Sequence, residues 1–266
     1  MLTGILVPSG GQVVACGLVP HRRRKELARR IGVVFGQRTQ LWWDLPLIES
    51  LDLLSYIYRV PRPRFEENLR EFRELLDLDP FLSTPVRQLS LGQRMRGGLA
   101  AALLHEPEIV YLDEPTIGLD VVAKYRIRDF LRQINRERGV TILLTTHDVA
   151  DIEQLCSRLL IVDHGKLLYD GSLDEIRERF GGERTLIVDL DDGMRDDEPL
   201  DTANAVQVRA DGPRRWLRFN RSAVSAAELI AAVSARYRIR DLSIEEPAIE
   251  GIIRMIYEEG MAPVAD

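Results

Sequence analysis

The sequence predicts an α/β fold built on a mostly parallel sheet that is interrupted by a helical insertion. Three short apolar runs, 31–35, 109–112 and 141–145, have the length and content of buried strands. Helical spacing of apolar residues fills the chain between them, and a strand, a helix and a strand in succession favour a right-handed parallel crossover. These observations together predict a layered α/β domain.

Composition excludes several classes of protein. The 266 residues suit one large domain plus a small one, and they carry 36 basic against 42 acidic residues, a net charge of −6. A chain with this balance has no overall basic field, so nucleic acid is not an expected partner. Cys16 and Cys156 lie in no metal-spaced pair. No apolar run reaches the roughly 18 residues of a membrane helix.

The first 60 residues combine short predicted elements with two adjacent tryptophans. Residues 1–6 resemble the end of a helix, 12–15 suit a strand, and 21–30 suit a basic helix that either meets phosphates or lipid headgroups or is simply solvated. Trp42 and Trp43 follow a polar loop, where large amphipathic rings serve as core anchors or as a docking surface.

An all-helical insertion is predicted at about 47–106. Helical spacing runs over 47–59 and 65–76, with prolines between the two segments. The insertion closes at Ser90, a good helix N-cap, and Gly92 follows it. This helix start is either a plain capped helix or a site where exposed backbone N–H groups meet an anion.

The strand at 109–112 ends in two carboxylates, Asp113 and Glu114. Ligands of open α/β sheets collect at the carboxyl ends of the strands, where one carboxylate can hold Mg²⁺ and its neighbour can act on a water. An acidic pair also ends many ordinary strands. The parallel crossover to 141–145 places His147 at the same edge, either as a cap or as a contact to a phosphate.

A hairpin at 159–169 and a second, smaller domain complete the chain. The glycines at 181–182 and the acidic run at 189–201 predict a linker and a solvated loop. Strands near Val206 and Leu217 and helices at 223–235 and 247–258 follow, so we expect a small α+β accessory domain at 183–266.

Several of these motifs occur in one order along the chain: the string LSLGQ at 89–93, the apolar strand that ends in Asp113 and Glu114, the turn at Gly118-Leu119-Asp120, and His147 after a threonine-rich strand. Together they resemble the signature, Walker B, D-loop and switch histidine of ABC-transporter ATPase subunits. Gln37, or Gln40 in a shifted register, resembles the Q-loop glutamine. The resemblance covers about residues 1–182. Within the family, the chain looks most like ATPase subunits of ABC-2 type bacterial exporters, similar to the drug-resistance and sodium-efflux groups.

This resemblance implies an ABC-type P-loop NTPase fold that binds ATP and Mg²⁺ between two head-to-tail subunits. It implies that Asp113 holds Mg²⁺, that Glu114 is the general base, and that His147 clamps the γ-phosphate. It also implies roles for further residues: nucleotide contact in trans for Ser90, Gly92 and Gln93, a link across the dimer for Asp120, and contact with the metal or the water for Gln37. The implied partners are a second copy and a separate membrane permease, which place the subunit in the cytoplasm on the inner face of the membrane.

One expected string is absent: no G-x-x-x-x-G-K-[ST] phosphate loop occurs in the sequence. We therefore expect the ATPase domain at 1–182 to be N-terminally truncated and this chain alone to be inactive. Either the true start lies upstream of Met1, or the chain pairs with an intact partner as a catalytically degenerate subunit. A soluble ABC ATPase that serves no transporter is the remaining alternative.

Overall fold

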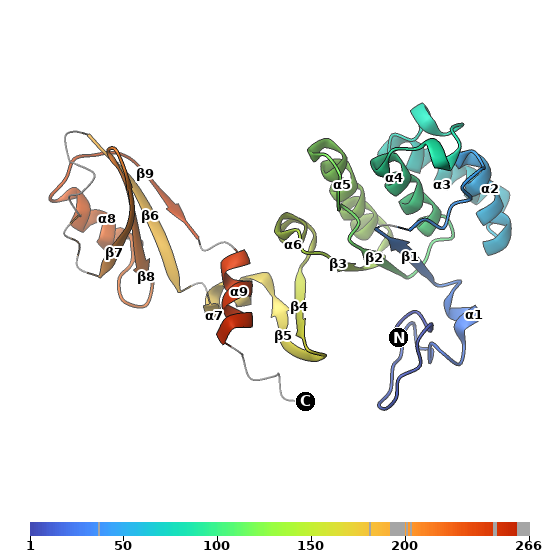
Figure 1. Cartoon of the computed structure of the whole chain (residues 1–266), viewed down its shortest axis with the longest axis horizontal. Coiled ribbons are helices and arrows are strands. Elements are labelled where there is room, and N and C mark those ends of the chain that lie inside the picture. Colours follow the sequence, from blue (N-terminus) through green and yellow to red (C-terminus); the bar gives the residue numbers. More distant parts are fainter. Residues whose placement is uncertain are drawn as a thin grey trace. The chain divides into compact units, whose positions relative to one another are not determined.

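The computed structural model (Figure 1) describes residues 1–36, 38–180, 182–191, 200, 202, 204–246 and 249–259. The chain divides into two compact units, Met1–Leu155 and Cys156–Asp266. The sequence instead predicts a domain boundary after residue 182, and that division stays a prediction.

The first unit contains a parallel three-stranded sheet with helices inserted between β1 and β2. Its elements in order are α1 (Arg24–Leu27), β1 (Ile31–Phe35), α2 (Leu47–Tyr58), α3 (Arg62–Leu75), η1 (Asp79–Phe81), η2 (Val86–Gln88), α4 (Leu91–Leu103), β2 (Ile109–Asp113), α5 (Val121–Arg138), β3 (Thr141–Thr145) and α6 (Val149–Leu155). The strands pair in the order β1-β2-β3. This arrangement confirms the predicted α/β fold with a parallel sheet and a helical insertion.

The core of the first unit lies between the sheet and the helices α2 to α5. Buried Leu51, Phe72, Leu99 and Phe130 belong to one apolar cluster with the sheet residue Leu112. Helix α4 lies directly on β1, because a Cβ atom at Gly32 would overlap the carbonyl oxygen of Ala102. The bare glycine lets the helix come this close, and that approach places the N-terminus of α4 near the ends of the strands.

The N-terminal segment differs from its prediction. No helix covers residues 1–6, only one isolated bridge from Ala15 to Leu18 replaces the strand at 12–15, and the helix at 21–30 shortens to α1. Leu27 is the buried residue of α1. Helices in proteins depend on an apolar face for most of their stability, so a mainly basic segment with one buried side chain forms a single turn.

The second unit has two separate cores. Its elements are β4 (Arg158–Asp163), β5 (Lys166–Ser172), α7 (Leu173–Phe180), β6 (Glu183–Leu190), β7 (Ala205–Asp211), β8 (Arg214–Asn220), α8 (Ala226–Ser234), β9 (Ile239–Glu245) and α9 (Ile249–Glu259). An antiparallel sheet of order β7-β8-β6-β9 packs its apolar face with α8. The isoleucine stripe of α9, Ile252 and Ile256, packs instead with the β4-β5 hairpin and α7.

The acidic loop predicted at 189–201 does not begin at residue 189. β6 continues through Leu190, which is buried, and residues 192–199 lie outside the described residues. Helix α8 begins after Ser225, whose side chain accepts a hydrogen bond from the Glu228 amide in a capping box. Within the described part of the chain, no helix is both long and apolar enough to cross a bilayer.

We predict that Gly32→Ala destabilises the first unit, because the added methyl group must push α4 away from β1. Overpacking of this kind costs about 1–3 kcal/mol. Gly10→Ala is the matched control: no atom lies within 4 Å of its added Cβ, so we expect a change below about 0.5 kcal/mol. Urea unfolding followed by tryptophan fluorescence measures both variants. Equal unfolding midpoints would contradict the close packing of α4 on β1.

Candidate functional site

Asp113 and Glu114 lie where the three parallel strands end. The register aligns Phe35, Asp113 and Thr145 across the sheet. The Thr145 hydroxyl donates to Asp113 Oδ1 over 2.7 Å, and the Asp113 side chain remains exposed. The sheet therefore fixes an accessible carboxylate at its carboxyl edge.

Glu114 turns the chain sharply away from β2. Its φ of 49° is left-handed, and its amide donates to the Thr145 carbonyl over 2.9 Å. Gly36 faces this turn, because a Cβ added there would lie 2.8 Å from the carbonyl oxygens of Asp113 and Glu114. A left-handed non-glycine residue costs free energy and persists where its surroundings hold it, as at many functional sites.

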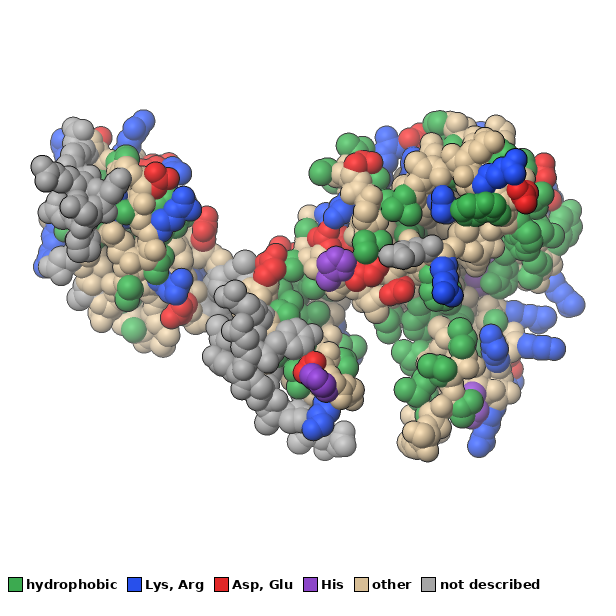
Figure 2. All heavy atoms as spheres, in the orientation of Figure 1, with side chains coloured by type: hydrophobic (Ala, Val, Ile, Leu, Met, Phe, Trp, Pro, Cys, Tyr) green, Lys and Arg blue, Asp and Glu red, His purple; other side chains and the backbone are tan. Residues whose placement is uncertain are grey.

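His147 contacts Glu114 from the neighbouring loop. Their atoms Nδ1 and Oε1 lie 2.8 Å apart, with the histidine side chain 73% exposed and the glutamate 29%. The hydrogen bond from the Glu114 carboxylate, followed by its charge, raises the pKa of His147 above the usual value. The structure thus brings together the acidic pair and the histidine as the parallel crossover predicts. Figure 2 shows acidic side chains and a histidine gathered over the region of β3 and α6.

The raised pKa of His147 has a chemical consequence. In its imidazolium form both ring nitrogens donate, so Nδ1 can bond Glu114 while Nε2 can bond an anion. The arrangement can therefore orient a carboxylate and bind a phosphate with one ring.

The helix that carries Ser90 and Gln93 begins with a complete capping box. The backbone N–H of Gln93 donates to Ser90 Oγ over 3.2 Å, and the backbone N–H of Ser90 donates to the side-chain oxygen Oε1 of Gln93 over 2.9 Å. Gly92 faces α5, because its added Cβ would lie 3.6 Å from the Cβ of Ala123. The structure therefore confirms the cap, and it keeps these three residues at an accessible helix N-terminus, the kind of position that favours anions.

Asp120 lies close to this helix start in the same unit. Its side chain caps α5 by accepting from the Ala123 amide over 2.9 Å, and the carboxylate is exposed. Leu91 of α4 packs near Gly118 of the same turn, since a Cβ added at Gly118 would lie 3.1 Å from Leu91 Cδ2. The signature residues and the turn at Asp120 thus form one continuous surface.

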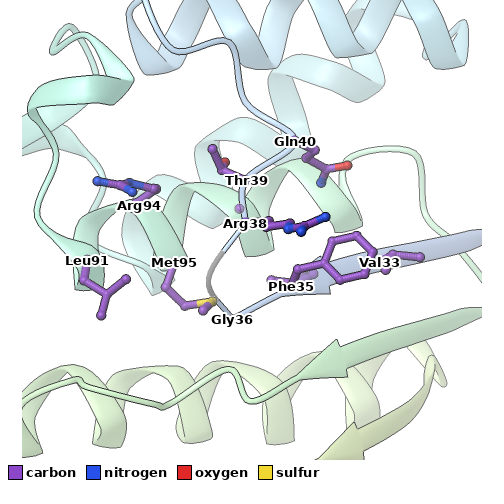
Figure 3. Close-up of a pocket in the computed structure, with 11 residues that line it drawn as sticks. Val33, Phe35, Gly36, Arg38, Thr39, Gln40, Leu91, Arg94 and Met95 are labelled. Carbon is purple, nitrogen blue, oxygen red and sulfur yellow. The ribbon is translucent and has the colours of Figure 1, made fainter.

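A pocket lies between the end of β1 and helix α4 (Figure 3). Its lining includes Gly36, Gln40, Leu91 and Met95. Gln37, the first choice for the Q-loop glutamine, lies outside the described residues, and Gln40 lines the pocket. The pocket connects the strand-end region to the signature helix through these side chains.

Trp42 and Trp43 lie on the surface of the first unit rather than in its core. They are 37% and 50% exposed. Arg94 of α4 stacks over the Trp43 ring, 4.8 Å from its centroid. Of the two interpretations left open by the sequence, this exposure favours a docking surface, because large exposed aromatic rings are typical of interfaces.

Mg²⁺ fits the oxygen donors at this edge. Mg²⁺ typically binds through one or two carboxylates, completing its shell with waters and substrate phosphates. Asp113 offers an exposed carboxylate of this kind, steadied by Thr145. No group of three or more potential protein ligands occurs among the described residues, and a nucleotide-bound Mg²⁺ does not need one.

Sequence reasoning overlooked three residues close to this site. Thr116, Thr146 and Asp151 are joined by hydrogen bonds between the loop after β2, the loop after β3 and helix α6. The sequence signals them only weakly, because single threonines and aspartates after strands are common. Asp151 is the fourth residue after His147, and this spacing is the only hint that it could serve the same loop.

Comparison with known proteins shows the family to which this chain belongs. The family model described as ABC transporter matches residues 1–117. The daunorubicin resistance ATP-binding protein DrrA3 of Streptomyces coeruleorubidus is 30% identical over 259 residues, which cover 95% of this chain and 80% of that protein. The ABC transporter ATP-binding protein NatA of Bacillus subtilis (strain 168) is 29% identical, over 67% of this chain and 72% of that protein.

Solved structures agree with the sequence matches. A dimeric, post-hydrolysis structure of the ATP-binding cassette MJ0796 bound to ADP and Pi superimposes with a TM-score of 0.57 and 27% identity, covering 64% of this chain and 77% of that one. The chain belongs to the family of ABC transporter ATP-binding proteins, whose ATPase domains bind ATP with Mg²⁺.

The Glu114–His147 contact predicts a pKa change that NMR titration can measure. Glu114→Gln should lower the pKa of His147 toward its ordinary value, because the hydrogen bond and charge that raise it are lost. Because the pKa is raised in the folded state, the contact stabilises fully below the ordinary value of about 6.5 and is lost as pH rises through the raised pKa.

Asp163→Asn provides the matched control for this titration. Asp163 raises the pKa of His164 through an equivalent contact, with Oδ2 and Nδ1 2.7 Å apart. Asp163→Asn should therefore lower the pKa of His164 and leave that of His147 unchanged. An unchanged His147 pKa in Glu114→Gln would show that the two side chains do not pair in solution.

Proposed function

We propose that this chain is part of an ATP-hydrolysing subunit that energises export through a separate membrane permease. The observation that supports it most is the 2.8 Å contact between Glu114 and His147 beside the exposed Asp113. A base, a phosphate-binding donor and a metal-binding carboxylate are the groups that phosphoryl transfer to water requires at one edge of a sheet.

Each of these residues has a distinct role. Glu114 orients and deprotonates the attacking water, and its carboxylate is held by His147 at the turn that follows β2. His147 donates from Nε2 to the γ-phosphate while Nδ1 holds the Glu114 carboxylate. Asp113 holds Mg²⁺, which supplies charge neutralisation at the phosphates when it is bound.

The signature surface acts on the nucleotide of a second subunit. Ser90, Gly92 and Gln93 present the capped N-terminus of α4 to the γ-phosphate in trans, and Asp120 joins the two sites across a homodimer. Three observations support this role: Ser90 and Asp120 are exposed and Gly92 and Gln93 partly exposed, α4 lies beside the turn at Asp120, and MJ0796 is dimeric. Gln37, or Gln40 in the pocket, contacts the metal or the water and senses nucleotide.

We assign the phosphate cradle to residues other than these 266, since the sequence contains no glycine-rich phosphate loop. Such a loop surrounds the β- and γ-phosphates with backbone N–H groups and a lysine, and ATP affinity depends on it. A segment encoded upstream is the proposed source. The groups described here then complete the site around the nucleotide.

The transport partner is proposed from the family and from the exposed tryptophans. The names of DrrA3 and NatA associate similar proteins with drug resistance and with an ABC transporter. We assign Trp42 and Trp43 to the surface that meets the permease at the inner face of the membrane. Hydrolysis would open and close the dimer and so move the permease.

A second candidate function is that of a non-enzymatic partner. The missing glycine-rich loop favours it, because a chain without a phosphate cradle could still offer its signature surface to an intact subunit. A soluble ABC ATPase outside transport has less support, because the net charge of −6 gives no overall basic field for nucleic acid.

Equilibrium binding of Mg·ATP distinguishes these candidates. We expect no binding by the 266-residue chain and micromolar binding, on the order of −8 kcal/mol, by a version extended upstream through an encoded glycine-rich loop. If neither form binds, the non-enzymatic partner becomes the better assignment. Equal binding by both forms would contradict an external phosphate cradle.

Glu114→Gln in the form that binds ATP should reduce hydrolysis by about 10²–10⁴-fold, because the general base is lost while nucleotide binding remains. It should also accumulate ATP-bound dimers, which size-exclusion chromatography detects. Glu108→Gln is the matched control: Glu108 pairs with Arg30 at the opposite end of β2, and its turnover should match the wild type. Unchanged turnover in Glu114→Gln would remove the catalytic assignment.

A further inference from the structure

A buried carboxylate lies between the two loops that carry Glu114 and His147. Asp151 of α6 has no exposed surface. Its Oδ2 accepts a hydrogen bond from the Thr116 hydroxyl and another, over 3.3 Å, from the Thr146 hydroxyl. Its Oδ1 accepts Arg128 Nε over 2.6 Å. One side chain therefore joins four segments of the first unit.

The two threonines that bond Asp151 lie within two residues of Glu114 and His147 in the sequence. Thr116 is buried two residues after Glu114, in a turn where the Ile117 amide also bonds the Glu114 carbonyl over 3.3 Å. Thr146 immediately precedes His147, and its hydroxyl accepts the Asp148 amide over 3.0 Å. The backbone on both sides of His147 is thus fixed through Thr146.

Arg128 offsets the free-energy cost of burying the Asp151 carboxylate. An unpaired charge in the interior costs several kcal/mol, and a hydrogen-bonded partner charge offsets that cost. Arg128, itself 8% exposed, also reaches Asp148 Oδ1 over 3.4 Å. Lys124 pairs with the same Asp148. Helix α5 therefore supplies the cations that hold the His147 loop.

We propose that Asp151 is a positioning residue that holds the Glu114 turn and the His147 loop in register, so that the two side chains meet. The inference goes beyond the proposed function and rests on it only for its effect on hydrolysis. Neither threonine hydroxyl nor Asp151 touches the reacting groups directly. The two hydroxyls instead hydrogen-bond the same oxygen atom, Asp151 Oδ2, from two separate loops. Movement of one loop therefore displaces the other.

A stabilising role alone would not need this arrangement. Buried ion pairs are weak sources of stability, because apolar residues of similar volume can often replace them at little cost. What an apolar residue cannot do is accept two directional hydroxyl bonds from different loops. The distinguishing property is therefore the geometry of Glu114 and His147 rather than the melting temperature.

The test compares imidazole NMR shifts of His147 in the folded 266-residue chain without nucleotide. Glu114→Gln gives the reference signal for a broken contact. We expect the double variant Thr116→Val, Thr146→Val to move the His147 signal most of the way to that reference, because both hydroxyl ties are lost while side-chain shape is kept. The double variant Thr116→Ser, Thr146→Ser keeps both hydroxyls and should retain the wild-type signal.

Thr141→Val is the matched control, since Thr141 is an exposed threonine at the other end of β3 and should leave the His147 signal unchanged. If the double valine variant does not fold, each single valine variant is measured, and each should shift the signal part of the way. A wild-type His147 signal in folded valine variants would overturn the proposal. Because no nucleotide is present, that result would leave the proposal of ATP hydrolysis standing.

Discussion

The parallel pairing of β2 with β3 is the constraint on which the rest of the site depends. It sets Asp113 opposite Thr145, whose hydroxyl donates to the Asp113 carboxylate. If the register of β3 against β2 slipped by one residue, Thr145 would lie on the other face of the sheet, because side chains alternate along a strand. The hydrogen bond from the Glu114 backbone N–H to the Thr145 carbonyl extends the pairing one step beyond the strand, into the turn at Glu114.

The close approach of α4 to β1 is the second constraint, and it links the ends of the strands to the N-terminus of α4. Gly32 allows that approach at the start of β1, and Gly36 allows the Glu114 turn to pack against its end. Both glycines belong to a strand or its end, where a side chain would ordinarily stabilise the sheet. The chain thus gives up local strand stability for proximity between the strand ends and the signature helix.

The sequence predicted the elements that rest on clear periodicity and missed those that rest on tertiary contacts. The three parallel strands, the helical insertion and the cap at Ser90 follow from apolar spacing and capping chemistry, and the structure confirms them. The short helix α1 was predicted too long, because charge pattern says little about burial. Asp151 was not identified, because its importance lies in hydroxyl partners that only the fold brings together. The role of Gln37 and the domain boundary after residue 182 stay predictions.

The capping box at Ser90 determines which polar atoms α4 can present to a ligand. Ser90 Oγ uses a lone pair to accept the Gln93 amide, and Gln93 Oε1 accepts the Ser90 amide. Each of these oxygens thereby uses one lone pair within the helix, while the serine hydroxyl hydrogen and the glutamine NH₂ group take no part in the capping box. The capping box therefore uses the two side-chain oxygens as acceptors and neither side-chain donor. The capping box thus holds these two donors beside the backbone N–H groups of the first turn of α4, and a helix start with such donors favours an anion.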